Sequence, residues 1–198
     1  MSMRLITPPT VAAEPLQVGD VSTWLADPSD DHATDIQALI VAAREDAEGI
    51  NGRVLAVSTW EKALEAWPGK TYIELLEPLK VVAPATSAIT SFTYKDSDGT
   101  THAMTEGADF IVDADSRPGR VMLPYSGSWP TATLWPASPI KIRFTAGMSP
   151  GDVEESIKVY MRAHVQASFD QPALVTENQS KRNPFIQNLA ARNAVVRF

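Results

Sequence analysis

The sequence predicts an α+β fold: a small helical core of one short and two long helices, with an inserted module of about five or six short antiparallel strands and an extended C-terminal arm. Two observations predict the core and its insertion. Apolar residues recur at helical spacing before residue 52 and again after residue 152, and short β-type runs separated by turn residues lie between them. A polar stretch interrupted by prolines then predicts the arm.

The length of 198 residues suits one domain, or a compact core with one sizeable insertion. We therefore expect four segments along the chain. Residues 1–57 form the N-terminal helical part of the core, 58–147 the β insertion module, 148–169 the long helix that completes the core, and 170–198 the C-terminal arm and tail.

Each helix is predicted from the spacing of its apolar residues. A short helix is expected within residues 16–25, ending before Asp27-Pro28. Residues 29–31 (SDD) offer N-cap oxygens to a long helix with Ile36, Ile40 and Ala43 on one face, and the chain is expected to reverse near Asn51-Gly52. The second long helix, over residues 153–167, is expected to pack on the first.

Short β-type runs follow, and turn residues separate them. The predicted strands cover residues 71–75, 89–94, 100–104, 110–112, 120–123 and 140–145. Asp98-Gly99 supplies the turn of a hairpin between the second and third of these strands, and residues 117–120 (RPGR) supply another turn. Periodicity leaves residues Thr59 to Trp67 open between an alternating strand and an amphipathic helix.

Composition excludes several function classes. The formal net charge of −7 opposes general binding to nucleic acid or anionic membranes. The chain has no cysteine, which removes disulfides, thiolate zinc sites and cysteine nucleophiles. No stretch approaches the roughly 20 apolar residues that span a bilayer. We therefore expect a soluble protein without a membrane partner.

The residues that could carry chemistry lack the spacing that chemistry needs. His32, His102 and His164 are far apart in the sequence, and phosphate-binding glycine loops and nucleophile elbows are absent from it. We therefore expect no metal, cofactor or catalytic site. Paired aspartates, such as Asp96 with Asp98, are interpreted as turn and cap residues. The five tryptophans are open between core packing and exposed interface roles.

Taken in order, the segments resemble the head-tail connector (adaptor) family of tailed phages, also found in prophages and gene transfer agents. The resemblance rests on LITPP (5–9), WL (24–25), DIQALIVAARE (35–45), NGRVL (51–55), TWE (59–61), ITSFTYKDSDG (89–99), DFIVD (109–113), PGR (118–120), SWP (128–130) and IKIRFTAG (140–147). It implies that residues 59–67 form a strand.

The resemblance also implies a function. Members of this family are structural virion proteins of the neck, made in the host cytoplasm, that form rings of usually twelve copies under the portal protein. They extend the DNA channel, through which double-stranded DNA passes without sequence-specific binding, and dock a tail-side stopper or tail terminator protein. That role needs no active site and no cofactor, but a closed ring needs two different surfaces on each subunit that fit one another.

The C-terminal tail is the predicted contact region with the portal or a neighbouring subunit. Its apolar and basic residues motivate this hypothesis: Lys181, Arg182, Phe185, Ile186, Leu189, Arg192, Val195, Arg197 and Phe198. Two alternatives stay open. One is another neck or tail-completion protein of a phage. The other is a hydrolase that uses Asp113 and Asp115, or Glu154 and Glu155.

Overall fold

The computed structural model describes residues 2–25, 30–83, 85 and 87–170, and within them it has the predicted α+β class. The chain divides into two compact units. We call the first, which contains Met1–Pro8 and Val57–Gly147, the β unit. The second, which contains Pro9–Ala56 and Met148–Phe198, is the helical unit.

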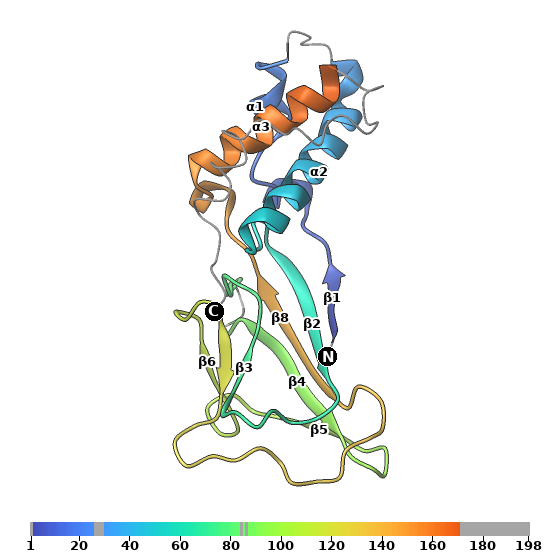
Figure 1. The fold of residues 1–198 in the computed structure, drawn as a ribbon, viewed down its shortest axis with the longest axis vertical. Coiled ribbons are helices and arrows are strands. Elements are labelled where there is room, and N and C mark those ends of the chain that lie inside the picture. Colours follow the sequence, from blue (N-terminus) through green and yellow to red (C-terminus); the bar gives the residue numbers. More distant parts are fainter. Residues whose placement is uncertain (1, 26–29, 84, 86, 171–198) are drawn as a thin grey trace. The chain divides into compact units, whose positions relative to one another are not determined.

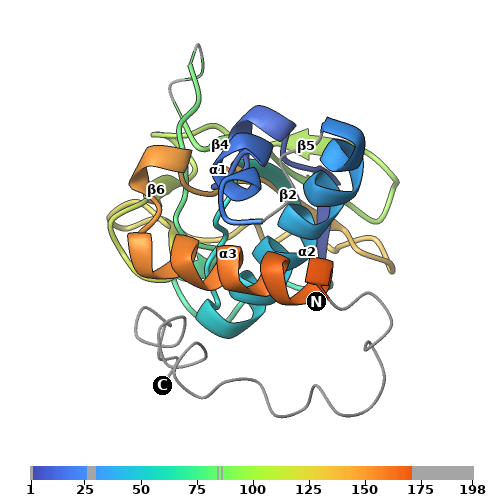
Figure 2. The same cartoon turned by 90° about the horizontal axis from the view of Figure 1, so that it is seen from above.

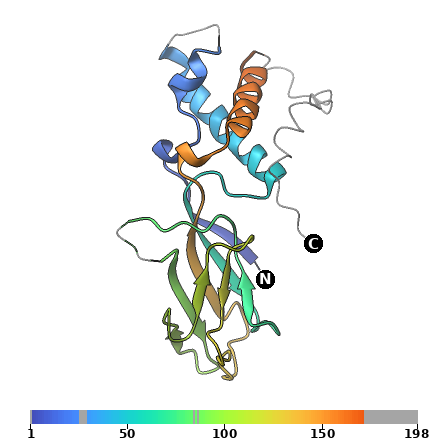
Figure 3. The ribbon, with the colours of Figure 1, turned by 90° about the vertical axis from the view of Figure 1, so that its left-hand side faces the viewer.

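The helical unit is built around two long helices that pack on each other, as predicted (Figures 2 and 3). Its described elements are the 3₁₀ turn Val11–Ala13, α1 (Val18–Ser22), the 3₁₀ turn Asp30–His32, α2 (Ala33–Asn51), the 3₁₀ turn Pro150–Asp152 and α3 (Glu155–Asp170). Ile36, Ile40 and Ala43 of α2 and Ile157 and Met161 of α3 are fully buried in one core. The predicted apolar face of α2 therefore faces its partner, whereas on α3 the apolar Val159 is exposed.

The helix ends are only partly as predicted. Gly52 follows α2 at φ 69°, a left-handed conformation that glycine adopts without steric cost, so the predicted reversal is confirmed. The predicted N-cap is wrong. Asp30 and Asp31 lie in the 3₁₀ turn that leads directly into α2, so the N-cap position falls to His32, whose side chain makes no capping hydrogen bond. Ser29 lies outside the described residues.

The β unit contains two antiparallel sheets (Figure 1). The five-stranded sheet has the order β1 (Ser2–Thr7), β2 (Ser58–Leu64), β8 (Ile140–Ala146), β4 (Ile89–Lys95) and β5 (Thr101–Ala103). The three-stranded sheet has the order β3 (Tyr72–Glu74), β7 (Arg120–Met122) and β6 (Ile111–Asp113). All six predicted strands are confirmed, and the open segment from Thr59 is a strand as far as Leu64.

β1 is a strand that the sequence pattern did not predict. It pairs with β2 as an edge strand, and this pairing places the first residues of the chain in the β unit. On β8, the buried Ile140, Ile142 and Phe144 alternate with Lys141 and Arg143. Because successive side chains of a strand point to opposite faces, the five-stranded sheet has one apolar, buried face and one charged face.

Candidate assembly surfaces

Three neighbouring strands place charged side chains in register on the outer face of the five-stranded sheet. Arg4 on β1, Glu61 on β2 and Arg143 on β8 are direct cross-strand partners. Arg4 Nη2 donates a hydrogen bond to Glu61 Oε1 at 3.2 Å, and Arg143 Nη2 donates to Glu61 Oε2 at 2.9 Å. Each oxygen of the buried carboxylate therefore accepts a hydrogen bond from a guanidinium group.

The exposure of these side chains decides whether the accessible charge on this face is positive or negative. The Glu61 side chain is 8 % exposed, whereas those of Arg4 and Arg143 are 70 % and 43 % exposed. Lys141, two residues before Arg143 and on the same face, is also exposed. The negative charge thus lies beneath the positive ones. We call Arg4, Lys141 and Arg143 the cationic sheet face.

Glu61 stays ionised in this setting. Burial on its own raises the pKa of Glu61, but the Arg143 hydrogen bond and the charges of Arg143, Lys141 and Arg4 together lower that pKa below its ordinary value. The carboxylate consequently ties β1 and β8 to β2 and fixes the direction of the two guanidinium groups. The outward charge of the face remains positive.

In the helical unit the cations are covered. A buried ion-pair cluster is centred on Arg44 of α2. Arg44 Nε donates to Glu14 Oε2 at 2.9 Å, and Arg44 Nη1 donates to Glu48 Oε2 at 2.7 Å. The other carboxylate oxygen of Glu48 accepts the Leu55 backbone N–H at 2.8 Å. Burial outweighs the attraction of the single guanidinium, so it raises the pKa of both Glu14 and Glu48.

Every lysine and arginine in the described part of the helical unit is held in an ion pair and largely covered. Their side-chain exposures run from 7 % to 19 %, and the four residues are Arg44, Arg53, Lys158 and Arg162. Asp35, Glu45 and Glu155 are 78 %, 67 % and 70 % exposed. We call the two that lie on α2, Asp35 and Glu45, the anionic helical surface. Glu155 begins α3 and pairs with both Lys158 and Arg162.

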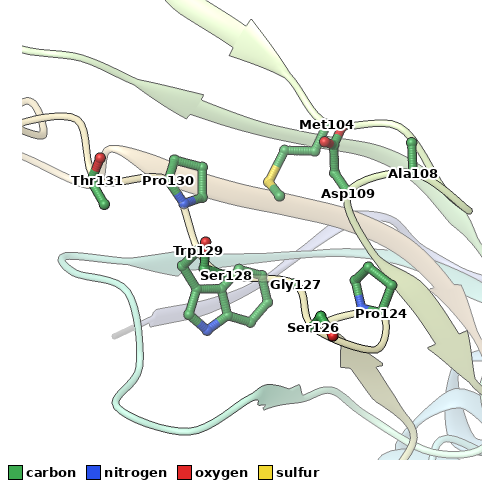
Figure 4. Close-up of a pocket in the computed structure, with 10 residues that line it drawn as sticks. All are labelled: Met104, Ala108, Asp109, Pro124, Ser126, Gly127, Ser128, Trp129, Pro130 and Thr131. Carbon is green, nitrogen blue, oxygen red and sulfur yellow. The ribbon is translucent and has the colours of Figure 1, made fainter.

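The β unit also contains an open pocket of about 430 Å³ beside Trp129 (Figure 4). The loop 124–131 lines it together with Met104 and Asp109. Trp129 stacks on Trp67 with ring centroids 5.0 Å apart, and its indole N–H donates to the Lys70 carbonyl. Asp109 is the one titratable lining residue, and it accepts the Thr105 backbone N–H at 2.7 Å. A single carboxylate in a turn does not supply an acid–base pair.

The tryptophans divide between the two roles left open by the sequence. Trp67 and Trp129 pack against one another within the β unit. Trp24 and Trp135, in contrast, are among the exposed large apolar side chains. Lys95 Nζ lies 4.1 Å from the centre of the Trp135 ring, a cation–π contact.

Three of the four carboxylates of the hydrolase alternative have local structural roles. Asp113 accepts hydrogen bonds from the Ser116 hydroxyl and from the backbone N–H groups of Ser116 and Asp115, and these bonds lower the pKa of Asp113. Glu154 accepts a hydrogen bond from Arg53 Nη1 at 2.8 Å, and Glu155 pairs with Lys158. Among the described residues, no group of three or more His, Cys, Asp or Glu side chains is placed to hold a metal.

The fold has relatives among solved structures. A chain in the neck of an empty gene transfer agent (GTA) particle computed with C6 symmetry matches 100 % of this chain and 97 % of its own length, with a TM-score of 0.77 and 18 % identity. Chains in the neck of a native GTA particle computed with C12 symmetry and in the virion of a native GTA particle cover the same shares, each with a TM-score of 0.76, at 18 % and 17 % identity.

The chain shares its fold with these GTA proteins. No sequence-family model and no curated protein matches the chain. Within the described residues, no helix is long and apolar enough to cross a membrane.

The predicted contact residues and the charged surfaces come from different parts of the chain. All nine predicted tail residues, from Lys181 to Phe198, lie outside the described residues. Sequence reasoning missed the cationic sheet face. The alternation in IKIRF (140–144) was a usable signal for Lys141 and Arg143, but the place of Arg4 depends on a strand that the pattern did not reveal.

Proposed function

We propose that the chain is a head-tail connector (adaptor) subunit of a tailed-phage or GTA-like particle. In this proposal it is located in the virion neck, forms a ring under the portal protein, extends the DNA channel and docks the next tail-side protein. The observation that carries the proposal is the match over 100 % of the chain, with a TM-score of 0.77, to a chain in a GTA neck. The ordered sequence segments named above support it independently.

The ring and its copy number have a separate line of support. The two neck structures are computed with C6 and C12 symmetry. A ring of twelve copies fits both, because a twelve-fold ring also satisfies six-fold symmetry. The proposed partners are a second copy of this chain, the portal and a tail-side stopper or terminator.

The proposed role is structural and not enzymatic. The carboxylates considered for hydrolysis, Asp113 and Glu154 among them, are used in a turn and an ion pair. The formal charge of −7 also suits a channel subunit, because a conduit that bound phosphates tightly would slow the DNA that passes through it.

Negative-stain imaging of the purified chain mixed with portal rings tests the connector role. We expect an added ring on the tail-side end of the portal, at one position and in closed form. The alternative, another neck or tail-completion protein, predicts that the portal rings stay bare. It also predicts binding to a preassembled portal–connector complex, which serves as the comparison sample.

We also propose that the tail contacts the portal or a neighbouring subunit. The nine tail residues combine apolar side chains with Lys181, Arg182, Arg192 and Arg197, which suits docking on an acidic surface. Deletion of residues 185–198 is expected to weaken docking to portal rings while leaving thermal unfolding unchanged. Docking of the deleted chain at the affinity of the full chain would contradict this role.

A further inference from the structure

We infer that the cationic sheet face of one subunit docks on the anionic helical surface of the next subunit in the ring. This inference rests on the proposed connector function, because it names the two surfaces by which a ring of this chain closes. It uses only features that each unit shows by itself: Arg4, Lys141 and Arg143 on the β unit, and exposed carboxylates on the helical unit.

The charge of the chain is divided unevenly between the two units. Residues 9–56 and 148–170 contain thirteen Asp and Glu but four Lys and Arg. Residues 1–8 and 57–147 contain ten Asp and Glu and nine Lys and Arg, so their balance is close to neutral. The net charge of −7 therefore comes mainly from the helical unit.

Burial increases this difference at the surface. In the helical unit the cations are covered, whereas the side chains of Asp35 and Glu45 are largely exposed. Glu45 lies 3.6 Å from Arg44, whose charge is shared with the buried Glu14 and Glu48. On the outer face of the five-stranded sheet the acid, Glu61, is covered and the two arginines that pair with it are exposed. Each unit thus presents the charge that complements the other.

A closed ring needs two different surfaces on each subunit that attract each other, and these two surfaces have opposite charge. A heterologous interface joins one face of a subunit to a different face of its neighbour. Two cationic sheet faces repel each other, and so do two anionic helical surfaces, so symmetric face-to-face dimers are disfavoured. Contact between unlike faces is favoured, and it propagates around a ring.

A second copy fits the cationic sheet face better than DNA does. Arg4 and Arg143 each give one N–H to Glu61, and that carboxylate lies directly under the face, where it would repel a phosphate. The face carries three cations, whereas a DNA-binding protein typically contacts about 6–10 phosphates. DNA binding is retained as an outcome of the test.

Charge exchange provides the test. The sheet variant carries Arg4→Glu and Lys141→Glu, and it keeps Arg143 as the partner of Glu61. The helix variant carries Asp35→Lys and Glu45→Lys. We expect each variant alone to add to portal rings with an apparent affinity lower by about tenfold or more, because like charges then face each other around the ring.

Mixing the two variants distinguishes a loss of charge complementarity from misfolding of either variant. The glutamates of the sheet variant match the lysines of the helix variant, and the unchanged surfaces also match, so equimolar mixing is expected to restore rings in which the two alternate. Arg117→Glu is the control, because Arg117 is an exposed cation in the β6–β7 turn, outside the cationic sheet face. Its rings are expected to equal those of the unchanged chain.

The outcomes distinguish the two proposals. If the unchanged chain adds no ring to the portal, the proposed function fails. If the unchanged chain forms rings and both variants do so equally well, or if mixing restores nothing, the inference fails. Rings of the sheet variant that persist but lose retention of a 30-base-pair duplex would assign the face to DNA.

Two measurements protect the test from misfolding. Circular dichroism and thermal unfolding report whether each variant is folded. The milder pair Arg4→Gln and Lys141→Gln removes the charge without reversing it, and it is expected to weaken ring addition by a smaller factor.

Ring addition by the unchanged chain is also expected to weaken as NaCl rises from 50 to 500 mM, and insensitivity to salt would overturn the inference.

Discussion

Arg44 offers the sharpest test of how the helical unit is held together. The single guanidinium, 7 % exposed, hydrogen-bonds both Glu14 and Glu48. The substitution Arg44→Met keeps an unbranched side chain but leaves two carboxylates without a cation. Breaking a buried ion pair by removing one partner costs about 3–5 kcal/mol. At about 2–4 °C per kcal/mol for a chain of this length, the melting temperature should fall by about 6–20 °C.

The cost of Arg44→Met should depend on pH. Burial already raises the pKa of Glu14 and Glu48, and removal of Arg44 takes away the largest opposing contribution. A raised pKa in the folded state means that the folded state binds protons more tightly than the unfolded state, so stability grows as pH falls toward the ordinary value of 4.5. The destabilisation at pH 5 should therefore be smaller than at pH 7.

Urea unfolding followed by circular dichroism at 222 nm measures this cost, since α2 and α3 supply most of the helical signal. The variant that also carries Glu14→Gln and Glu48→Gln is expected within about 1 kcal/mol of the unchanged chain, because it buries no unpaired charge. Arg162→Met is the control. It removes an ion pair with the exposed Glu155, worth about 0.2–1 kcal/mol, and a cation–π contact with Trp24, worth about 0.5–1 kcal/mol.

Two results would refute this reasoning. One is a loss below about 1 kcal/mol for Arg44→Met at pH 7, which would mean that the carboxylates gain water when Arg44 is removed. The other is an equal loss in the variant with both glutamines, which would assign the effect to packing and not to charge.

Four further substitutions test the fold. Gly49→Ala, inside α2 with no atom within 4 Å of the added Cβ, should gain about 0.5–1 kcal/mol, while Gly52→Ala, at φ 69°, should lose about 1–2 kcal/mol; urea unfolding ranks the two. Gly119→Ala places its Cβ 2.6 Å from Leu79 Cγ and should cost about 1–3 kcal/mol, read as a lower melting temperature. Phe144→Ala, in the buried sheet face, should cost about 3–5 kcal/mol by the same measurement, and a cost below 1 kcal/mol would contradict its core position.

Local sequence signals predicted most of the elements. The buried faces of α2 and α3 follow the spacing of residues such as Ile36, Ile40 and Ile157, and the end of α2 follows from Gly52. The hairpin of β4 and β5 follows from Asp98-Gly99. These features were predictable because helix periodicity and tight turns are encoded by neighbouring residues.

Long-range pairing explains what could not be predicted. β1 is stabilised by β2, and Arg4 meets Glu61 across a sequence separation of 57 residues. A short edge strand followed by two prolines has little signal of its own, since its partner supplies the hydrogen bonds. The sequence pattern therefore indicated only two of the three residues of the cationic sheet face, Lys141 and Arg143. The tail site from Lys181 onward stays a prediction.

The central claim is that this chain forms a ring at the portal, and a reconstruction of the purified chain bound to portal rings tests it most directly. We expect a closed ring of twelve copies, coaxial with the portal and on its tail-side end, with the β unit of each subunit facing the helical unit of its neighbour. A chain that binds the portal as scattered monomers, or that does not bind it, would contradict the account.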